Sequence, residues 1–240
     1  MKPDIILAWP RSCDYPLWRQ FLRPYRNKFE KVIIVFTETN YGEDYRSFLR
    51  DAFSEDDVIA IDSPPVRGDQ DWRNVAVNLA LQYSTSEWVW FTEQDFLPVS
   101  DQFWNEIYYL SKSYQVFGAF AEKRLHPCCI FMHRKLLDET PKKFGVVKDR
   151  LDHFGQIQQS LEVRGISIAT IRPETYHHMN GLSQNYCLAF NKQPINHNPA
   201  EFAQYLKDCL DVLVPQDNRF MAFAKGFLGT NGETPESGGE

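Results

Sequence analysis

The sequence predicts an α/β protein built on a mixed, mostly parallel sheet with helices on both faces. Three apolar runs rich in β-branched residues, DIILAW (4–9), KVIIVFTE (31–38) and DVIAID (57–62), alternate with segments of helical pattern. Continuous apolar runs are typical of strands buried on both faces, and strand-helix alternation is typical of parallel sheets. The chain of 240 residues can bury a core, and no repeat or linker divides it.

The helical segments of the first half each have their own signal. YPLWRQFLRPY (15–25) predicts a short helix that Pro24 ends, and DYRSFLRDAF (44–53) predicts a second. Within 71–84, Asp71 can cap a third helix, and Asn74 and Asn78 share one of its sides. Its apolar residues recur at helical spacing and predict one face, formed by Trp72, Val75, Ala76, Leu79, Ala80 and Tyr83.

The fourth strand, EWVWFT (87–92), leads into a second half with longer loops. We expect a helix near 101–112, strands at 115–121 and 126–134, and a helix at 151–165 closed by Gly165. The helix at 151–165 should turn Phe154, Ile157 and Leu161 inward. The run 166–173 predicts a last strand, 199–214 predicts a final amphipathic helix, and 229–240 has nothing to bury and should be disordered.

Charge and cysteine content exclude some classes of protein. A net charge of −6 and a pI near 5.6 argue against a surface coated with positive charge. The first apolar run is too short for a signal sequence, no stretch could span a membrane, and the five cysteines show no CxxC spacing. We therefore expect a soluble, cytoplasmic protein with reduced thiols. A local excess of basic and aromatic residues lies near the N-terminus, at Trp9, Arg11, Trp18, Arg19, Arg23 and Arg26.

Glu93, Gln94 and Asp95 directly follow the fourth strand, at the edge of a parallel sheet where ligands bind. Two carboxylates separated by one residue on extended backbone project to the same side, and Mg2+ or Mn2+ takes oxygen ligands of this kind. Such a cation could stabilise a nucleotide diphosphate as a leaving group. The alternative is that the acids only mark the solvated end of a strand.

The order of an R-N-x-A-x-N-x-A helix (73–80) and an aromatic strand ending in an acidic motif resembles the GT-A glycosyltransferases. Their DxD motif stands at this point, although the motif here is ExD, within the variation known for it. HPCCIFMHR (126–134) and DHFGQIQQSLEVRG (152–165) are similar to the family's acceptor half. The resemblance covers residues 4–180 and implies one GT-A-like, Rossmann-like domain over 1–228, with a donor half of about 1–98 and an acceptor half of about 99–214.

The resemblance implies a metal site and a donor site. Asp95 would be the main ligand of Mn2+ or Mg2+, and Glu93 would bind the metal or the ribose. His178, which follows His177, would add a ligand, unless it is a structural histidine. The resemblance also implies contacts to a nucleotide diphosphate sugar: Pro10, Arg11 and Ser12 would contact the base, Asp62 uracil or ribose, and Gln94 would lie beside the metal. Arg67 and Arg73 would bind the diphosphate, although either arginine could instead be a surface charge.

On the acceptor side, Asp152 matches the catalytic base of an inverting enzyme, which removes a proton from the attacking hydroxyl. An Asp before a helix can also be an ordinary N-cap, so both roles stay open. His126 and His153 are the implied acceptor-binding residues. Cys128 and Cys129 are expected to face opposite sides of a strand rather than to bind zinc with His126.

The implied function is a metal-dependent, inverting hexosyl- or pentosyltransferase. The acceptor hydroxyl would belong to a glycan or, given the basic aromatic N-terminus, to a hydroxymethylated base, as in phage DNA glucosyl- and arabinosyltransferases. A nucleotidyltransferase and a non-catalytic sugar-nucleotide binding protein are the alternatives. The loop WPRSCDYP (9–16) lacks the glycines of the former, and GxSxG, GxxxxGK[ST] and an early GxGxxG are absent.

Overall fold

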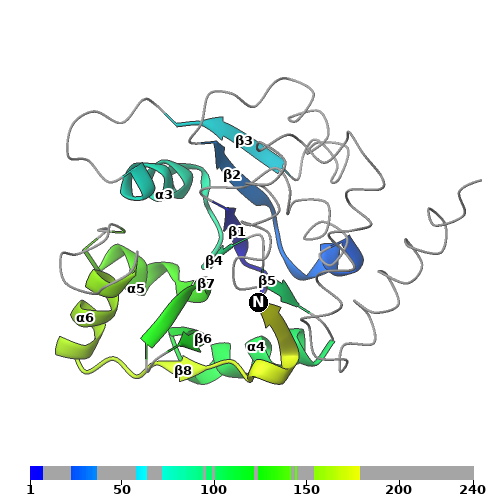
Figure 1. The fold of residues 1–240 in the computed structure, drawn as a ribbon, viewed down its shortest axis with the longest axis vertical. Helices are drawn as coiled ribbons and strands as arrows, with labels where there is room; N and C mark the ends of the chain where they lie inside the picture. The colour runs from blue at the N-terminus through cyan, green and yellow to red at the C-terminus, as the bar shows by residue number, and fades with distance from the viewer. Residues whose placement is uncertain are drawn as a thin grey trace, which may run out of the picture.

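A computed structural model describes residues 1–7, 23–36, 58–63, 72–93, 96–98, 101–121, 124–141, 144 and 154–178. These residues form a seven-stranded mixed sheet in the order β3-β2-β1-β4-β7-β6-β8, shown in Figure 1. The first four strands in this order are parallel, β7 runs antiparallel to β4 and β6, and β8 runs parallel to β6. Their bounds are β1 Asp4–Leu7, β2 Val32–Phe36, β3 Val58–Asp62, β4 Trp88–Thr92, β6 Val116–Ala121, β7 Arg124–His133 and β8 Ala169–Thr170. The predicted α/β fold with a mostly parallel sheet is therefore confirmed.

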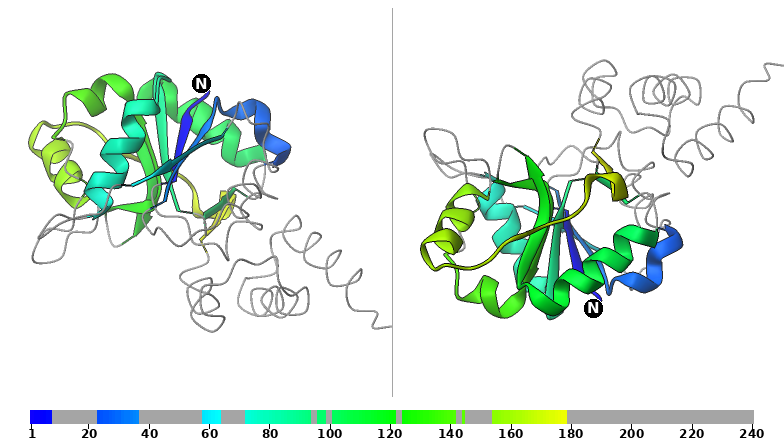
Figure 2. Two further views of the ribbon diagram at one scale, coloured as in Figure 1. Left: turned by 90° about the horizontal axis from the view of Figure 1, so that it is seen from above. Right: turned by 90° about the horizontal axis from the view of Figure 1, so that it is seen from below.

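Helices cover both faces of this sheet, as the two views of Figure 2 show. One face carries α3 (Trp72–Tyr83), α5 (Arg134–Asp138) and α6 (Gly155–Val163), and the other carries α4 (Asp101–Ser113) and the 3-10 helix η1 (Arg23–Lys28). A short 3-10 helix, η3 (Pro173–Thr175), precedes β9 (Tyr176–His178), and β9 pairs with β5 (Phe96–Pro98) in a separate two-stranded sheet. None of the helices in these described ranges is long and apolar enough to cross a membrane.

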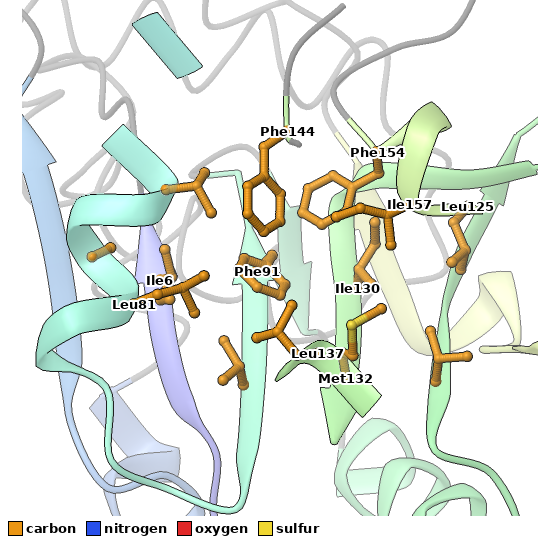
Figure 3. Packing of buried hydrophobic residues seen from close by; sticks show 14 of the residues in the cluster. Ile6, Leu81, Phe91, Leu125, Ile130, Met132, Leu137, Phe144, Phe154 and Ile157 are labelled. Carbon is orange, nitrogen blue, oxygen red and sulfur yellow. The ribbon is translucent and has the colours of Figure 1, made fainter. Parts of the chain in front are cut away.

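Successive side chains of β4 point to opposite faces of the sheet, and both faces are covered by helices. Val89 and Phe91 contribute to the core beneath α3, α5 and α6, where Phe91 meets Phe144 and Phe154 with ring centroids 5.7 and 5.0 Å apart (Figure 3). Trp90 points to the opposite face and stacks on Phe131 at 5.0 Å. Because every residue of β4 is buried, the strand appears in the sequence as a continuous apolar run rather than as an alternating one.

The second core, on the α4 face, is almost entirely aromatic. Trp90 also contacts Phe96 of β5, and Phe103 and Trp104 of α4, with centroids 5.8 and 5.7 Å away for the last two. Aromatic pairs of this kind add roughly 0.5–1.5 kcal/mol each beyond the burial of their area. This cluster fixes α4 and β5 relative to the end of β4, where the acidic motif follows.

A buried carboxylate, Asp4, lies at the amino-terminal end of the parallel strands, opposite the end that carries the acidic motif. Asp4, fully buried at the start of β1, accepts hydrogen bonds from the Ser84 hydroxyl at 2.9 Å and from the Thr85 and Ser86 amides at 2.7 and 2.9 Å. Arg134 donates to the Ser84 carbonyl at 2.8 Å. These bonds fix the loop that joins α3 to β4, and thereby the register of β4 beside β1.

Two local predictions need correction, and a third falls mostly outside the described residues. Pro24 lies in the first turn of η1, where a missing N–H costs nothing, and the rest of the helix predicted over 15–25 lies largely outside the described part. The buried residues of α3 include Val77 and Leu81 with Ala76 and Ala80, whereas Tyr83 is 43% exposed. Ala76 and Ala80 are buried as predicted, but Val77 and Leu81 are buried in place of Tyr83, so the buried face is rotated from the predicted one. The last predicted strand shrinks to the two residues of β8.

The α6 helix ends as the sequence predicts. Phe154, Ile157 and Leu161 are buried, and Gly165 takes a positive φ of 67°. The Gly165 amide donates to the Glu162 carbonyl at 3.0 Å and the Ile166 amide to the Leu161 carbonyl at 2.9 Å. This bonding pattern is a Schellman motif, which favours glycine at the left-handed position.

Candidate functional site

The end of β4 places Glu93 at the carboxyl edge of the parallel strands. The Glu93 amide donates to the Cys128 carbonyl of β7 at 3.2 Å, and the Glu93 carbonyl accepts from the Phe96 amide at 3.2 Å. The Thr92 hydroxyl lies 3.0 Å from the carbonyl oxygens of both Glu93 and Cys128. The backbone of Glu93 is thus anchored to a central strand, and its half-buried side chain lies at the edge where α/β sheets bind ligands.

The β5–β9 ribbon brings the predicted histidine segment to the same place. Phe96, the residue after Asp95, pairs with His178, Leu97 pairs with His177, and Pro98 pairs with Tyr176. The Phe96 and Tyr176 rings, 4.6 Å apart, close one face of the ribbon. Segments some eighty positions apart in the chain are therefore neighbours. The side chains of His177 and His178 lie outside the described part.

A register shift in β7 carries His126 close to this edge. Gly118 of β6 pairs with Ile130, yet Phe120 pairs with Leu125, so β7 has extra residues between these two pairs. His126 falls within this stretch and its Nδ1 accepts from the Cys128 amide at 3.2 Å. Cys128 also receives the Glu93 amide, so β7 places His126 two residues from a direct contact of the acidic motif.

The two cysteines of β7 lie in an apolar environment. Both are buried, and burial raises the pKa of the Cys129 thiol well above its usual range. A thiol must lose its proton to bind zinc, so this environment is unfavourable for a ligand. Among the described residues no three His, Cys, Asp or Glu side chains gather into a group that could hold a metal. The carboxylate of Asp95 and the imidazole of His178 lie outside that search.

The paired asparagines of α3 serve the fold. The side-chain amide of Asn78 donates to Asn74 Oδ1 at 3.0 Å, and the same Asn74 oxygen accepts from the backbone amide of Phe144 at 3.0 Å. The pair therefore ties the helix to the segment that covers the first core. The predicted shared side of Asn74 and Asn78 is confirmed.

The remaining predicted site residues are placed in part or not at all. Asp62 is the last residue of β3 and is exposed. The N-cap of α6 is Phe154, two residues beyond Asp152, and it makes no side-chain cap bond. For Arg73 only the backbone, in α3, is described. The predicted residues outside the described ranges are Pro10, Arg11, Ser12, Arg67, Gln94, Asp95, Asp152 and His153.

The donor set at this edge fits a hard divalent cation in its chemistry. Glu93 supplies carboxylate oxygens, and the β5–β9 register puts two histidines opposite the residues that directly follow Asp95. Carboxylate and neutral imidazole together are competent ligands for Mn2+. These residue types are the ones that the predicted metal site calls for at the carboxyl end of β4.

One residue near β9 was not predicted from the sequence, Glu106 of α4. Its side chain, only 10% exposed, pairs with Arg172 Nε at 3.2 Å, just ahead of β9. The one available signal was its position three residues after the buried Phe103, which places an acid beside the apolar face of an amphipathic helix.

This fold is that of the GT-A glycosyltransferases. The mannosyltransferase PcManGT from Pyrobaculum calidifontis, solved with GDP-Man and Mn2+, matches with a TM-score of 0.52 at 15% identity, over 95% of this chain and 81% of that one. Glucosyl-3-phosphoglycerate synthase from Mycobacterium tuberculosis, solved with Mn2+, UDP-Glc and phosphoglyceric acid, gives 0.53 at 13% identity, over 87% and 79%. TarS 1–349 from S. aureus gives 0.50 at 14%, over 99% and 76%.

The likeness is one of structure alone. No protein-family model matches the sequence, and no curated protein matches it either. At identities of 13–15% these neighbours establish the GT-A-like fold, and the activity of this chain has to be argued from its own residues.

Proposed function

We propose that the protein is a metal-dependent, inverting glycosyltransferase that moves a hexosyl or pentosyl group from a nucleotide diphosphate sugar to an acceptor hydroxyl. The observation that carries this proposal is the β5–β9 register, which pairs the residues that directly follow the ExD motif with the YHH segment. In a GT-A-like sheet the carboxyl end of β4, which this motif follows, lies at the edge where a nucleotide ligand binds. Two of the matched structures were solved with Mn2+ and a nucleotide sugar, which supports the same assignment.

On the donor side, Asp95, Glu93 and His178 would hold Mn2+ or Mg2+. The bound cation offsets the negative charge of the diphosphate leaving group. Pro10, Arg11, Ser12 and Asp62 would position the nucleoside, Gln94 would lie beside the metal, and Arg67 and Arg73 would bind phosphate oxygens through paired guanidinium donors.

On the acceptor side, Asp152 would act as general base. Its carboxylate takes the proton of the acceptor hydroxyl as that oxygen forms a bond to the anomeric carbon from the face opposite the diphosphate. The bond from the anomeric carbon to the diphosphate breaks, and its electron pair leaves with the nucleotide. A single displacement of this kind inverts the anomeric centre. His126 and His153 would bind the acceptor.

The acceptor class follows less directly from the described residues. The basic aromatic segment motivates a hydroxymethylated DNA base, but one of its members, Arg26, is already engaged. Its guanidinium donates to the Phe29 and Glu30 carbonyls, both at 2.8 Å, and lies over the Phe29 ring at 5.0 Å. A DNA-binding face would therefore rest on Arg11, Arg19 and Arg23, whose side chains lie outside the described part.

The proposal is tested by supplying UDP- and GDP-sugars with Mn2+ and measuring release of nucleoside diphosphate, with glycans or DNA duplexes carrying 5-hydroxymethylcytosine as acceptors. We expect metal-dependent release from one donor. Glu93→Gln, which removes the charge and keeps the size, should slow it about 10-fold or more. Glu139→Gln, an acid of α5's end that pairs with Arg164, is the control and should leave the rate unchanged.

Other products would contradict the proposal in distinct ways. Release of pyrophosphate from a nucleoside triphosphate and a sugar phosphate would identify a nucleotidyltransferase. Binding without turnover for every donor and acceptor would identify a sugar-nucleotide binding protein. If DNA is the acceptor, its binding should weaken steeply between about 50 and 200 mM salt, because phosphate contacts release counterions.

A further inference from the structure

The segment 171–175, called the strap below, connects the edge of the main sheet to the ribbon that carries the histidines. It leaves β8, where the Ile171 amide donates to the Gly118 carbonyl at 2.9 Å, and passes through η3 into β9. Figure 2 shows this yellow segment crossing from β8 towards β5 on the α4 side. The position of the strap therefore determines where His177 and His178 arrive.

One carboxylate holds the strap. Glu106 Oε1 accepts from the Arg172 amide at 3.1 Å and pairs with Arg172 Nε at 3.2 Å, while Glu106 Oε2 lies 3.5 Å from the Thr175 hydroxyl. The fully buried Thr175 donates instead to the Arg172 carbonyl at 2.7 Å, which closes the turn on itself. The Glu106 carboxylate thus binds both the backbone and a side chain of the strap.

The helix that bears Glu106 also holds the opposite strand of the ribbon. Phe103, three residues earlier in α4, packs on Phe96 of β5 with centroids 5.7 Å apart. Positions i and i+3 of a helix lie on the same side, so Phe103 contacts β5 and Glu106 contacts the strap from one surface of α4. Phe96 completes the connection through its contact with Tyr176.

The chemistry of Glu106 suits a fixed anchor. At 10% side-chain exposure, an ionised carboxylate needs charged or strong hydrogen-bond partners to offset its lost hydration. The Arg172 guanidinium and backbone amide supply both, and a guanidinium pair is directional as well as strong. Removing the carboxylate therefore leaves Arg172 and the turn without the contact that sets their place on α4.

We propose that Glu106 is a positioning residue for the candidate metal site: it holds the strap on α4 so that β9, which carries His178, pairs with β5, the strand that directly follows the acidic motif. This inference rests on the proposed function. It assigns Glu106 a supporting role in the site, without direct contact to the donor or the metal. Partners behind a metal ligand orient it, and their loss commonly weakens metal binding by about 10- to 100-fold.

The test compares Glu106→Ala and Glu106→Gln with Glu139→Gln, which breaks another Arg-Glu pair, Glu139 with Arg164 at 2.8 Å, away from the ribbon. Two quantities are measured: amide hydrogen exchange in peptides covering 172–178, and Mn2+ affinity by electron paramagnetic resonance with GDP or UDP present. In Glu106→Ala we expect faster exchange at 176–178 and Mn2+ affinity lowered about 10- to 100-fold. Gln keeps an acceptor for the Arg172 amide, so its effects should be intermediate, and Glu139→Gln should match the wild type in both.

The outcomes separate this inference from the proposed function. Unchanged exchange at 176–178 in Glu106→Ala overturns the positioning role, whatever the protein catalyses. Faster exchange with unchanged Mn2+ affinity also overturns it, because the strap would then not serve the site. A wild type that binds no Mn2+ with either nucleotide overturns the proposed function and the metal role of Glu106 together, while the exchange data still show whether Glu106 holds β9.

Discussion

Asp152→Asn is expected to keep donor and metal binding intact while transfer falls by about 10²- to 10⁴-fold, the range that general base catalysis contributes. The amide cannot take the proton of the acceptor hydroxyl, but it has the size and hydrogen-bonding reach of the carboxylate. Asparagine is also as good an N-cap as aspartate, so the substitution separates a catalytic role from a capping one. The measurements are the rate of transfer and the rise in melting temperature on adding donor nucleotide with Mn2+.

The matched control for this substitution is Asp149→Asn, three residues earlier in the same segment. It should retain the wild-type transfer rate. Transfer that survives in Asp152→Asn would remove Asp152 from the mechanism, and donor binding lost along with transfer would point to a structural effect. The observation that Phe154 is the N-cap of α6 already separates Asp152 from the simplest structural role.

Gly118→Ala is expected to cost about 3 kcal/mol of unfolding free energy, the upper end of what overpacking costs. A Cβ at Gly118 would lie 2.3 Å from the Cys129 carbonyl oxygen and 3.1 Å from Ile130 Cα. Both obstacles are backbone, so β6 and β7 must move apart. For a chain of this size the melting temperature should fall by about 2–4 °C per kcal/mol, hence by about 6–12 °C.

Gly165→Ala is the control that separates steric conflict from backbone strain. A Cβ at Gly165 would meet nothing within 4 Å, but its φ of +67° disfavours a side chain. The expected cost is about 1–2 kcal/mol, smaller than at Gly118. Equal stabilities of Gly118→Ala and the wild type in thermal melts would show that β6 and β7 do not approach as closely as the structure places them.

The periodic elements were predictable because their burial is continuous in sequence. β1, β2, β3 and β4 are short apolar runs, and α4 and α6 show the spacing of one buried helical face. The end of α6 was predictable too, since a left-handed position selects glycine locally. In each of these elements the information lies within a window of about one helix or strand.

The ribbon and its anchor were not predictable for the opposite reason. β5 and β9 have three residues each, and their pairing joins Phe96 to His178, some eighty positions later in the chain. The Glu106 contact with Arg172 spans 66 positions. Neither the β5–β9 pairing nor the Glu106–Arg172 contact produces a periodic pattern in the sequence. The acidic motif and the histidines could therefore be predicted, but the contacts between their segments could not. The face of α3 was predicted only in part, because Ala76 and Ala80 are buried as expected whereas Val77 and Leu81 are buried in place of Tyr83.

The most direct test of the central claim, a metal and nucleotide site after β4, is thermal melting with UDP, GDP and other nucleoside diphosphates, with and without Mn2+, on the wild type and Asp95→Ala. A ligand present at about 100 times its Kd stabilises the native state by about 2.7 kcal/mol, which at this size raises the melting temperature by about 5–10 °C. We predict such a shift for one nucleotide, dependent on Mn2+ and absent in Asp95→Ala. No shift with any nucleotide, or an equal shift in Asp95→Ala, would contradict the site.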